Sequence, residues 1–258
     1  MSYRLGVDVG GTFTDFLLIN ESDGSTYTAK VPSTPEDSSI GVLNGVTRIC
    51  EQSGVNPKDI KLVMHGTTVA TNAVLTGNGA KVGLLTTQGY ESILQVARSF
   101  CPGGLGGWVS FVKGPLLAPL ELTYGIKERT DATGEISIPL DEDHLKEQLT
   151  QLKKRGQVEA LTISFVNSYI NNTNEVLAAK IAAEIFTDVP ISISSEVIPE
   201  MQEYERAETT VLNSYVRPQV SSYVNNLQSN LEKSLGSDVQ LSIFCLLYTS
   251  PSPRDLTA

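Results

Sequence analysis

Short apolar runs alternate with segments of helical periodicity along most of the chain. Runs rich in β-branched and aromatic residues predict strands, and apolar residues recurring every three or four positions predict helices. The expected strands cover residues 3–9, 16–19, 26–31, 60–64, 81–86, 122–129, 136–138, 160–164, 191–194 and 239–244. The expected helices cover residues 36–53, 69–75, about 92–98, 142–155, 174–186 and 203–234. This order predicts an α/β fold with a mixed sheet and an opening hairpin.

Three helices carry more detailed expectations. In the first long helix, the face expected to be buried consists of Ile40, Leu43, Val46 and Ile49. In the last helix, the expected buried side consists of Tyr204, Ala207, Val211, Tyr215, Val220 and Tyr223. Asp141 is expected to cap the helix that follows it, because an Asp side chain can accept a free backbone N–H there.

Residues 6–15 read Gly-Val-Asp-Val-Gly-Gly-Thr-Phe-Thr-Asp and join the first two expected strands. Glycines in the turn tolerate positive φ and allow the backbone to approach a ligand, so the turn N–H groups can bind phosphate. The phosphate-binding candidates are Gly10, Gly11, Thr12, Thr14 and Asp15. Asp8 would repel a bare phosphate, which favours a Mg²⁺ ion with retained waters between the two. The alternative is an ordinary hairpin with a solvated Asp at each end.

A second polar cluster, His65-Gly66-Thr67-Thr68-Val69-Ala70-Thr71-Asn72, lies between an expected strand and an expected helix. Its N–H groups and hydroxyls would point at a ligand beyond the strand end. The candidates are His65, Gly66, Thr67, Thr68 and Asn72. His65 could orient or protonate a substrate oxygen. The alternative is a helix cap by Thr67 or Thr68, with His65 partly buried.

Composition narrows the classes of partner and compartment. The 258-residue chain is 40% hydrophobic, carries a net charge of −10 and has no apolar run approaching the ~18 residues of a membrane span. We therefore expect neither nucleic acid nor a membrane as a partner. Three cysteines spaced far apart and the lack of a signal-peptide pattern indicate a cytoplasmic protein. Two histidines without paired cysteines do not favour a zinc site built by the protein.

The stretch from Asp8 to Asp15 resembles the first phosphate loop of the actin, sugar-kinase and Hsp70 superfamily. Together with the run from His65 to Asn72, it resembles the A subunit of ATP-dependent hydantoinases and 5-oxoprolinases. The resemblance implies a ribonuclease H-like lobe, with ATP and Mg as cofactors and Asp8 as the metal residue. It also implies Asp8 and His65 as catalytic residues and a hydantoinase B-type subunit as partner. ATP would then phosphorylate the carbonyl oxygen of a hydantoin or lactam, and water would attack the activated carbon.

Two alternative functions stay open. The run from Cys101 to Trp108 is rich in glycine and resembles the ATP-dependent ketone carboxylases of acetone and acetophenone type, which would form an enol phosphate. A sugar-kinase-like or ATP-sensing protein could share only the phosphate loop, but the run from His65 to Asn72 argues against this. Two further candidates are Arg98, which could bind a carboxylate or phosphate, and Arg206, which could act between domains.

The resemblance also predicts a domain division. Residues 1–194 would form the hydantoinase/oxoprolinase N-terminal domain, and residues 195–244 would begin a second, truncated domain. Residues 245–258 resemble translated sequencing-adapter read-through and are expected to be a non-native tail, with a natural Pro-Ser tail as the alternative. Because phosphoryl transfer needs groups on several sides of the phosphate, the chain alone is expected to be inactive as an ATPase.

Overall fold

A computed structural model describes residues 2–10, 12–34, 38–99, 106–107 and 114–245. The chain divides into two compact units. Unit 1 consists of Met1–Asn78 and Gln219–Ala258, and unit 2 consists of Gly79–Pro218. The boundary predicted at residue 194 separates two family domains, not two compact units. It stays a prediction. Within the described ranges, no helix is both long enough and apolar enough to cross a membrane.

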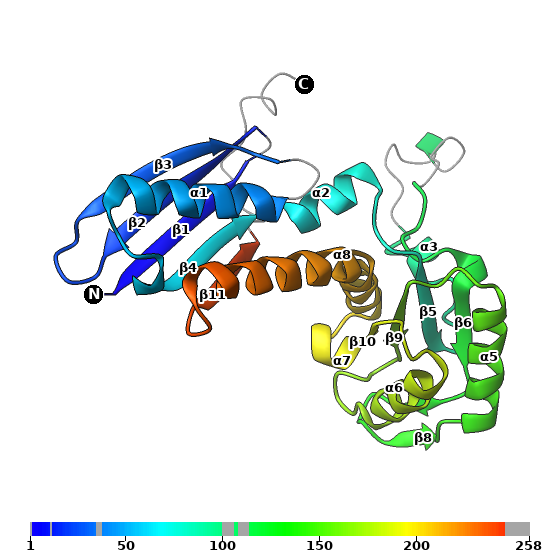
Figure 1. Cartoon of the computed structure of the whole chain (residues 1–258). Coiled ribbons are helices and arrows are strands. Elements are labelled where there is room, and N and C mark those ends of the chain that lie inside the picture. The colour runs from blue at the N-terminus through cyan, green and yellow to red at the C-terminus, as the bar shows by residue number, and fades with distance from the viewer. Residues whose placement is uncertain (1, 11, 35–37, 100–105, 108–113, 246–258) are drawn as a thin grey trace. The chain divides into compact units, whose positions relative to one another are not determined.

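Unit 1 is built on a mixed five-stranded sheet (Figure 1). Its strands, in the order β11-β4-β1-β2-β3, span Gln240–Cys245, Ile60–Thr67, Tyr3–Val9, Phe13–Asn20 and Thr26–Pro32. The first three strands of the chain form an antiparallel meander, whereas β4 runs parallel to β1 and β11 runs parallel to β4. A meander continued by parallel strands in this order is the arrangement expected of a ribonuclease H-like lobe. The predicted α/β fold with a mixed sheet and an opening hairpin is therefore confirmed.

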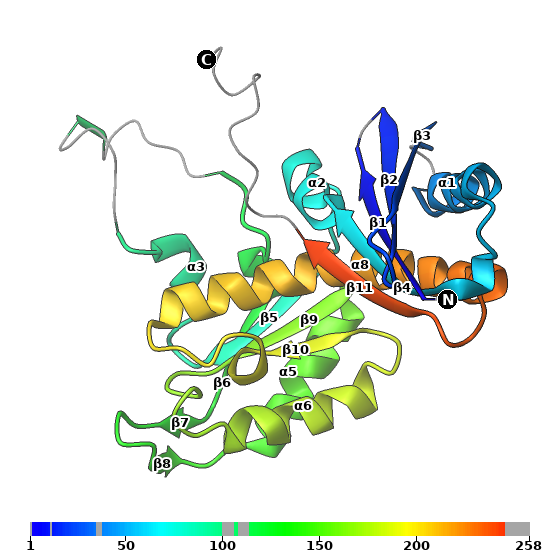
Figure 2. The same cartoon turned by 90° about the vertical axis from the view of Figure 1, so that its left-hand side faces the viewer.

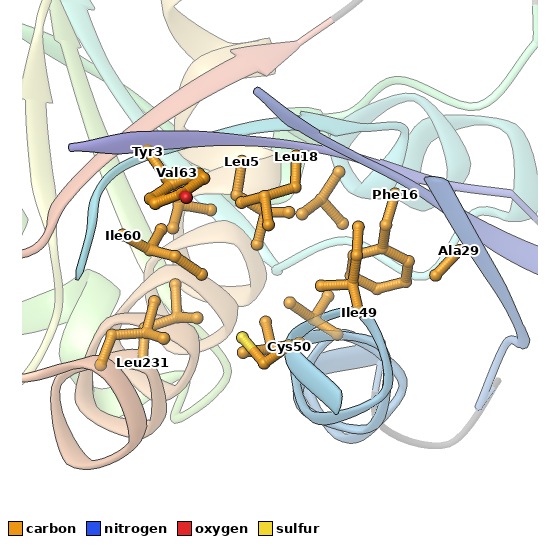
Figure 3. Packing of buried hydrophobic residues seen from close by; sticks show 14 of the residues in the cluster. Tyr3, Leu5, Phe16, Leu18, Ala29, Ile49, Cys50, Ile60, Val63 and Leu231 are labelled. Atoms are coloured by element: carbon orange, nitrogen blue, oxygen red, sulfur yellow. The ribbon is translucent and has the colours of Figure 1, made fainter. Parts of the chain in front are cut away.

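The core of unit 1 lies between one face of this sheet and two helices, α1 (Ser38–Ser53) and the second half of α8 (Glu203–Leu235). Alternate strand residues point into it, because side chains in a strand alternate between the two faces. Figure 3 shows Leu5, Leu18 and Val63 of the sheet packed toward Ile49 and Leu231 of the helices. Cys50 is also enclosed here, and burial raises the pKa of its thiol.

The buried face of α1 differs from the prediction. Ile40 is 48% exposed, whereas Val42 is buried beside Val46 and Ile49. The reason is a close approach at Gly45, where an added Cβ would lie 1.9 Å from the Phe16 ring. The helix therefore meets the sheet along the stripe that flanks Gly45, and this rotation turns Ile40 toward solvent.

Unit 2 contains a parallel four-stranded sheet in the order β10-β9-β5-β6 (Figure 2). These strands span Ile191–Ile193, Ala160–Ser164, Val82–Thr87 and Thr123–Ile126. Helices α5 (Glu142–Lys154) and α6 (Thr173–Ile185) cover one face, and the first half of α8 packs on the other. Every residue of β5 and β9 is buried, as expected for parallel strands covered on both faces.

The smaller elements refine the predicted boundaries. Asp141 caps α5 as predicted, since its side chain accepts the N–H of His144 at 3.0 Å. The strand expected over residues 122–129 is instead split into β6 and β7 (Arg129–Thr130), and β7 pairs with β8 (Ile136–Ile138). The remaining helices are short: α2 (Val69–Thr76), α3 (Ile93–Val96) and α7 (Ser194–Val197).

In the first half of α8, the predicted residues Ala207, Val211 and Tyr215 are buried, whereas Tyr204 is only partly buried. In the second half the buried residues are Leu227, Leu231 and Leu235. Val220 and Tyr223 are only partly buried. The helix also continues through Pro218.

Candidate functional site

β1 ends at Val9 and β2 begins at Phe13, so the connection between them, called here the Gly10 turn, is short. The N–H of Gly10 donates to the carbonyl of Phe13 at 3.0 Å. An added Cβ at Gly10 would lie 2.9 Å from that same backbone oxygen, so the turn requires glycine there. Thr12 is exposed. Gly11, the third candidate of the turn, lies outside the described residues.

Ser33 follows β3, is not among the predicted site residues, and holds this turn in place. Its hydroxyl donates to the carbonyl of Gly10 at 2.7 Å, and its N–H donates to the carbonyl of Thr12 at 2.9 Å. Two carbonyls of the turn are thus bound by Ser33, and the N–H of Gly10 is bound by the carbonyl of Phe13. The sequence alone did not indicate this role of Ser33, because only the pairing of Phe13 with Pro32 brings Ser33 to the turn.

Thr14 lies on the covered face of the sheet. Its side chain is fully buried, and its hydroxyl lies 3.0 Å from that of Ser33. Strand alternation explains the difference, because Thr14 points to the covered face of the sheet while its neighbour Asp15 points to the other face. Thr14 therefore supports the turn through Ser33, and its assignment as a ligand stays a prediction.

Asp8, Asp15 and Gly66 form a row across three strands on the face opposite the core. Asp8 of β1 is the register partner of Asp15 in β2 and of Gly66 in β4. Both carboxylates are exposed. All three residues line a groove of about 830 Å³ in unit 1. The two predicted polar motifs therefore meet in the structure through the backbone of Gly66 and the side chains of the two aspartates.

His65 is not among the residues that line this groove, and its catalytic role stays a prediction. Because β4 extends to Thr67, His65 lies within the strand, one position before Gly66, and points to the covered face. Its side chain is fully buried, and its Nε2 lies 2.7 Å from the hydroxyl of Tyr223 in α8. Burial lowers the pKa of His65, while the backbone of Val7 and the carboxylate of Asp8 act in the opposite direction.

The remaining members of the second motif make local contacts around the start of α2. The hydroxyl of Thr67 is buried and accepts the N–H of Val69 at 3.3 Å. Thr68 occupies the N-cap position without a side-chain cap, and its hydroxyl accepts a bond from the Asn72 amide at 3.3 Å. Thr68 and Asn72 are exposed. Their geometry resembles the helix-capping alternative more than a set of ligand contacts, and their assignment stays a prediction.

The candidates in unit 2 have partners inside that unit. Arg98 forms an ion pair with Glu205 and donates to Gln202 at 2.8 Å. Arg206 is 1% exposed and donates to the carbonyls of Phe165 and Glu200 at 2.9 and 3.0 Å. Cys101 and Trp108 lie outside the described residues.

The groove fits a magnesium ion that keeps its waters. Carboxylate oxygens are hard ligands that Mg²⁺ accepts, usually one or two from the protein with water and phosphate completing the shell. Asp8 and Asp15 offer that number from adjacent strands. In the described part of the chain, no group of three or more His, Cys, Asp or Glu residues could hold a metal by itself. The donor set therefore suits a shared metal–phosphate site better than an all-protein metal site.

Comparisons with known proteins place these features in a family. Residues 4–186 match the model of the hydantoinase/oxoprolinase N-terminal region. The chain is 35% identical to caprolactamase subunit alpha of Pseudomonas jessenii over 235 residues, which cover 90% of this chain and 34% of that protein. It is 33% identical to the acetophenone carboxylase gamma subunit of Aromatoleum aromaticum, over 98% of this chain and 36% of that protein.

A solved structure supports the same relationship. The crystal structure of the ATP-dependent caprolactamase from Pseudomonas jessenii aligns with a TM-score of 0.82 at 33% identity, covering 93% of this chain and 35% of that one. The chain spans about a third of the length of the curated relatives it matches. The family match covers well over half of the described fold and includes both polar motifs. The chain therefore belongs to the hydantoinase/oxoprolinase family, as the residues from Asp8 to Asp15 and from His65 to Asn72 predicted.

Proposed function

We propose that this chain supplies a nucleotide phosphate site to an ATP-dependent enzyme that opens cyclic amides by hydrolysis. The observation that carries the proposal is the row of Gly66, Asp8 and Asp15, which lie in register on an exposed sheet face beside the Gly10 turn. The identity with a caprolactamase subunit supports a cyclic amide as the substrate class. When bound, ATP would supply the phosphoryl group that activates the carbonyl oxygen of the amide.

Apart from Asp15, the residues of the row and their neighbours have proposed tasks. The N–H of Gly10 is already bonded to the carbonyl of Phe13, so the backbone N–H of Thr12 is the group proposed to bind a phosphate oxygen, and Ser33 fixes the turn by holding its carbonyls. Asp8 holds a hydrated Mg²⁺ ion, because its carboxylate is exposed at the end of β1. Gly66 has no side chain, so it leaves room for the phosphates next to Asp8. His65 acts by position: its bond to Tyr223 fixes the end of β4 and thereby the location of Gly66.

The chain is proposed to act with further parts. Transfer of a phosphoryl group is catalysed by positioning and by charge stabilisation from several sides. The groove offers one side, formed by strands of the sheet together with Arg48 and Gln52 of α1. We propose that a B-type partner subunit and the regions present in the longer relatives provide the others, and that the 258-residue chain alone binds Mg-ATP weakly without turnover.

One alternative has support of its own. The acetophenone carboxylase gamma subunit aligns with 98% of this chain, and the run from Gly103 to Trp108 resembles that type of enzyme. In that case the activated carbonyl would belong to a ketone, with bicarbonate as second substrate. The phosphate site itself would be the same in both functions.

The first test measures phosphate release by an enzyme of the relatives' full length that contains this chain, together with its partner subunit. Lactams, hydantoins, 5-oxoproline and small ketones with bicarbonate are compared as substrates. The Asp8→Asn variant should lose on the order of 100- to 1,000-fold in turnover, the cost typical of losing one charge-stabilising group. The control is Asp238→Asn, an exposed aspartate just before β11, at the opposite end of the parallel strands.

Each outcome has a clear meaning. Lactam- or hydantoin-dependent release that Asp8→Asn abolishes supports the proposal. Release strictly dependent on a ketone and bicarbonate would replace the amide function by the carboxylase function. Unchanged turnover in Asp8→Asn would remove Asp8 from the metal site.

A further inference from the structure

Lys30 extends the row of Gly66, Asp8 and Asp15 by one strand. It lies in β3 as the register partner of Asp15, on the same face of the sheet, and it lines the same groove. Its Nζ lies 3.0 Å from Oδ1 of Asp15. We propose that Lys30 is a phosphate-binding residue of this site, and that its ammonium moves from Asp15 to a phosphate oxygen when Mg-ATP binds. This inference rests on the proposed function.

The position of the ammonium favours this role. Besides its contact with Asp15, Nζ lies 5.3 Å from the ring centroid of Phe13, the residue directly after the phosphate turn. The lysine side chain therefore leans along β3 toward the turn. A flexible side chain with a compact charge at its tip can reach a phosphate there without movement of the strand.

The negative charges of the groove explain why an ammonium group there would favour phosphate binding. Asp8 and Asp15 both face the groove, so a polyphosphate entering it meets two like charges. A magnesium ion offsets part of this repulsion, and a nearby ammonium offsets more. Asp15 in turn keeps Lys30 in place before the nucleotide arrives.

The ion pair is also easy to exchange. The side chains of Lys30 and Asp15 are 57% and 55% exposed, and exposed pairs of this kind contribute little to stability. A phosphate group carries more negative charge than a carboxylate group, so the ammonium of Lys30 can move from Asp15 to a phosphate oxygen. The competing explanation is that Lys30 only guards an edge strand against pairing with other chains, since β3 ends the sheet.

The test measures Mg-ATP binding to the 258-residue chain by displacement of a fluorescent nucleotide. Lys30→Met should weaken binding about tenfold, as expected for the loss of a charge-assisted hydrogen bond. Lys30→Arg should stay within about threefold of the original chain, because it keeps the charge. Lys61→Met, at an exposed position near the start of β4, is the matched control and should leave binding unchanged.

Asp8→Asn separates this inference from the function on which it rests. Loss of binding in Asp8→Asn with normal binding in Lys30→Met would overturn the role of Lys30 alone and favour the edge-strand explanation. Absence of Mg-ATP binding by the original chain would overturn both proposals. If Lys30→Met and Lys61→Met weaken Mg-ATP binding equally, the cause is the change in net charge, and this result would also overturn the inference. Because Lys30 is exposed, its variants should keep the melting temperature of the original chain.

Discussion

The two units of the chain place their charged residues in opposite ways. Unit 1 keeps Asp8, Asp15 and Lys30 on an exposed sheet face. Unit 2 encloses Glu175 and Arg206, which are 0% and 1% exposed. The difference follows from the sheets, since the charged row of unit 1 lies on the face away from its core and the parallel sheet of unit 2 is covered on both faces.

In unit 2, neighbouring elements form hydrogen bonds with the buried side chains of Glu175 and Arg206. Glu175 of α6 accepts the N–H of Phe165 at 2.8 Å and the hydroxyl of Ser194 at 2.6 Å. Arg206 of α8 donates to that same hydroxyl at 3.2 Å. These bonds tie the carboxyl ends of β9 and β10 to two helices.

Glu128 belongs to the same interior. It is 3% exposed, and its carboxyl group accepts bonds from Thr87 and from the Asn174 amide at 2.9 Å. Burial is the largest effect on this group and raises the pKa of Glu128. The buried charged groups Glu128, Glu175 and Arg206 of unit 2 thus have hydrogen-bond partners inside that unit, whereas Asp8 and Asp15 of unit 1 face an open groove. This contrast is why the candidate chemistry is assigned to unit 1.

The largest effect expected from this comparison comes from Arg206→Met. Removing the guanidinium leaves the buried carbonyl of Phe165 without its donor and Glu203 without its ion-pair partner, which should cost about 3–5 kcal/mol of unfolding free energy. Urea unfolding followed by circular dichroism measures this. Arg98→Met, which breaks an exposed ion pair, is the control and should cost about 1 kcal/mol or less. Equal losses in the two variants would contradict the distinction between enclosed and open charges.

Next in size is Gly45→Ala in unit 1. The new methyl group would overlap the buried ring of Phe16, with 1.9 Å between their carbons, and should cost about 1–3 kcal/mol. Asn44→Ala, at the neighbouring exposed position, should be neutral or slightly stabilising. Phe16→Leu in the same chain should reduce the cost of Gly45→Ala, because the two sites share one contact. Simple additivity would show that the helix does not approach the sheet at Gly45.

A smaller effect is expected from the buried His65. Its pKa is lowered by burial, so protonation favours the unfolded state. The stability that depends on neutral His65 is fully present above the unfolded value of 6.5 and is lost as the pH falls through the lower folded value. The melting temperature should therefore fall as the pH decreases below about 6.5.

His65→Gln should remove that part of the slope, at a cost of about 1 kcal/mol for the altered bond to Tyr223. His144→Gln in unit 2 is the control and should keep the slope. A slope unchanged in His65→Gln would show that another group causes the acid sensitivity.

The smallest effect on stability belongs to Asp15→Asn. Its ion pair with Lys30 is exposed, so the unfolding free energy should change by about 1 kcal/mol or less. The same urea experiment provides the measurement. A loss of unfolding free energy as large as that in Arg206→Met would mean that the exposed pair of Asp15 and Lys30 supports the fold as strongly as the buried hydrogen bonds of Arg206.

The sequence by itself determined the element order, the opening hairpin and the family. An alternating apolar run predicts a strand whichever strands it later pairs with. The turn after Asp8 needs glycine because of contacts with residues only a few positions away. The cap at Asp141 was predictable for the same reason. These features depend on residues a few positions apart, so no knowledge of the fold was needed.

Only the tertiary structure decided which side chains share the groove. The strand expected to end at Met64 continues to Thr67, and alternation along those added residues turns His65 into the core while Gly66 meets Asp8. Ser33 and Lys30 reach the site through the pairing of β2 with β3, a register that no local pattern specifies. Side-chain direction in a sheet depends on counting residues from a fixed pairing, and that pairing is set by contacts between strands that are distant in the sequence.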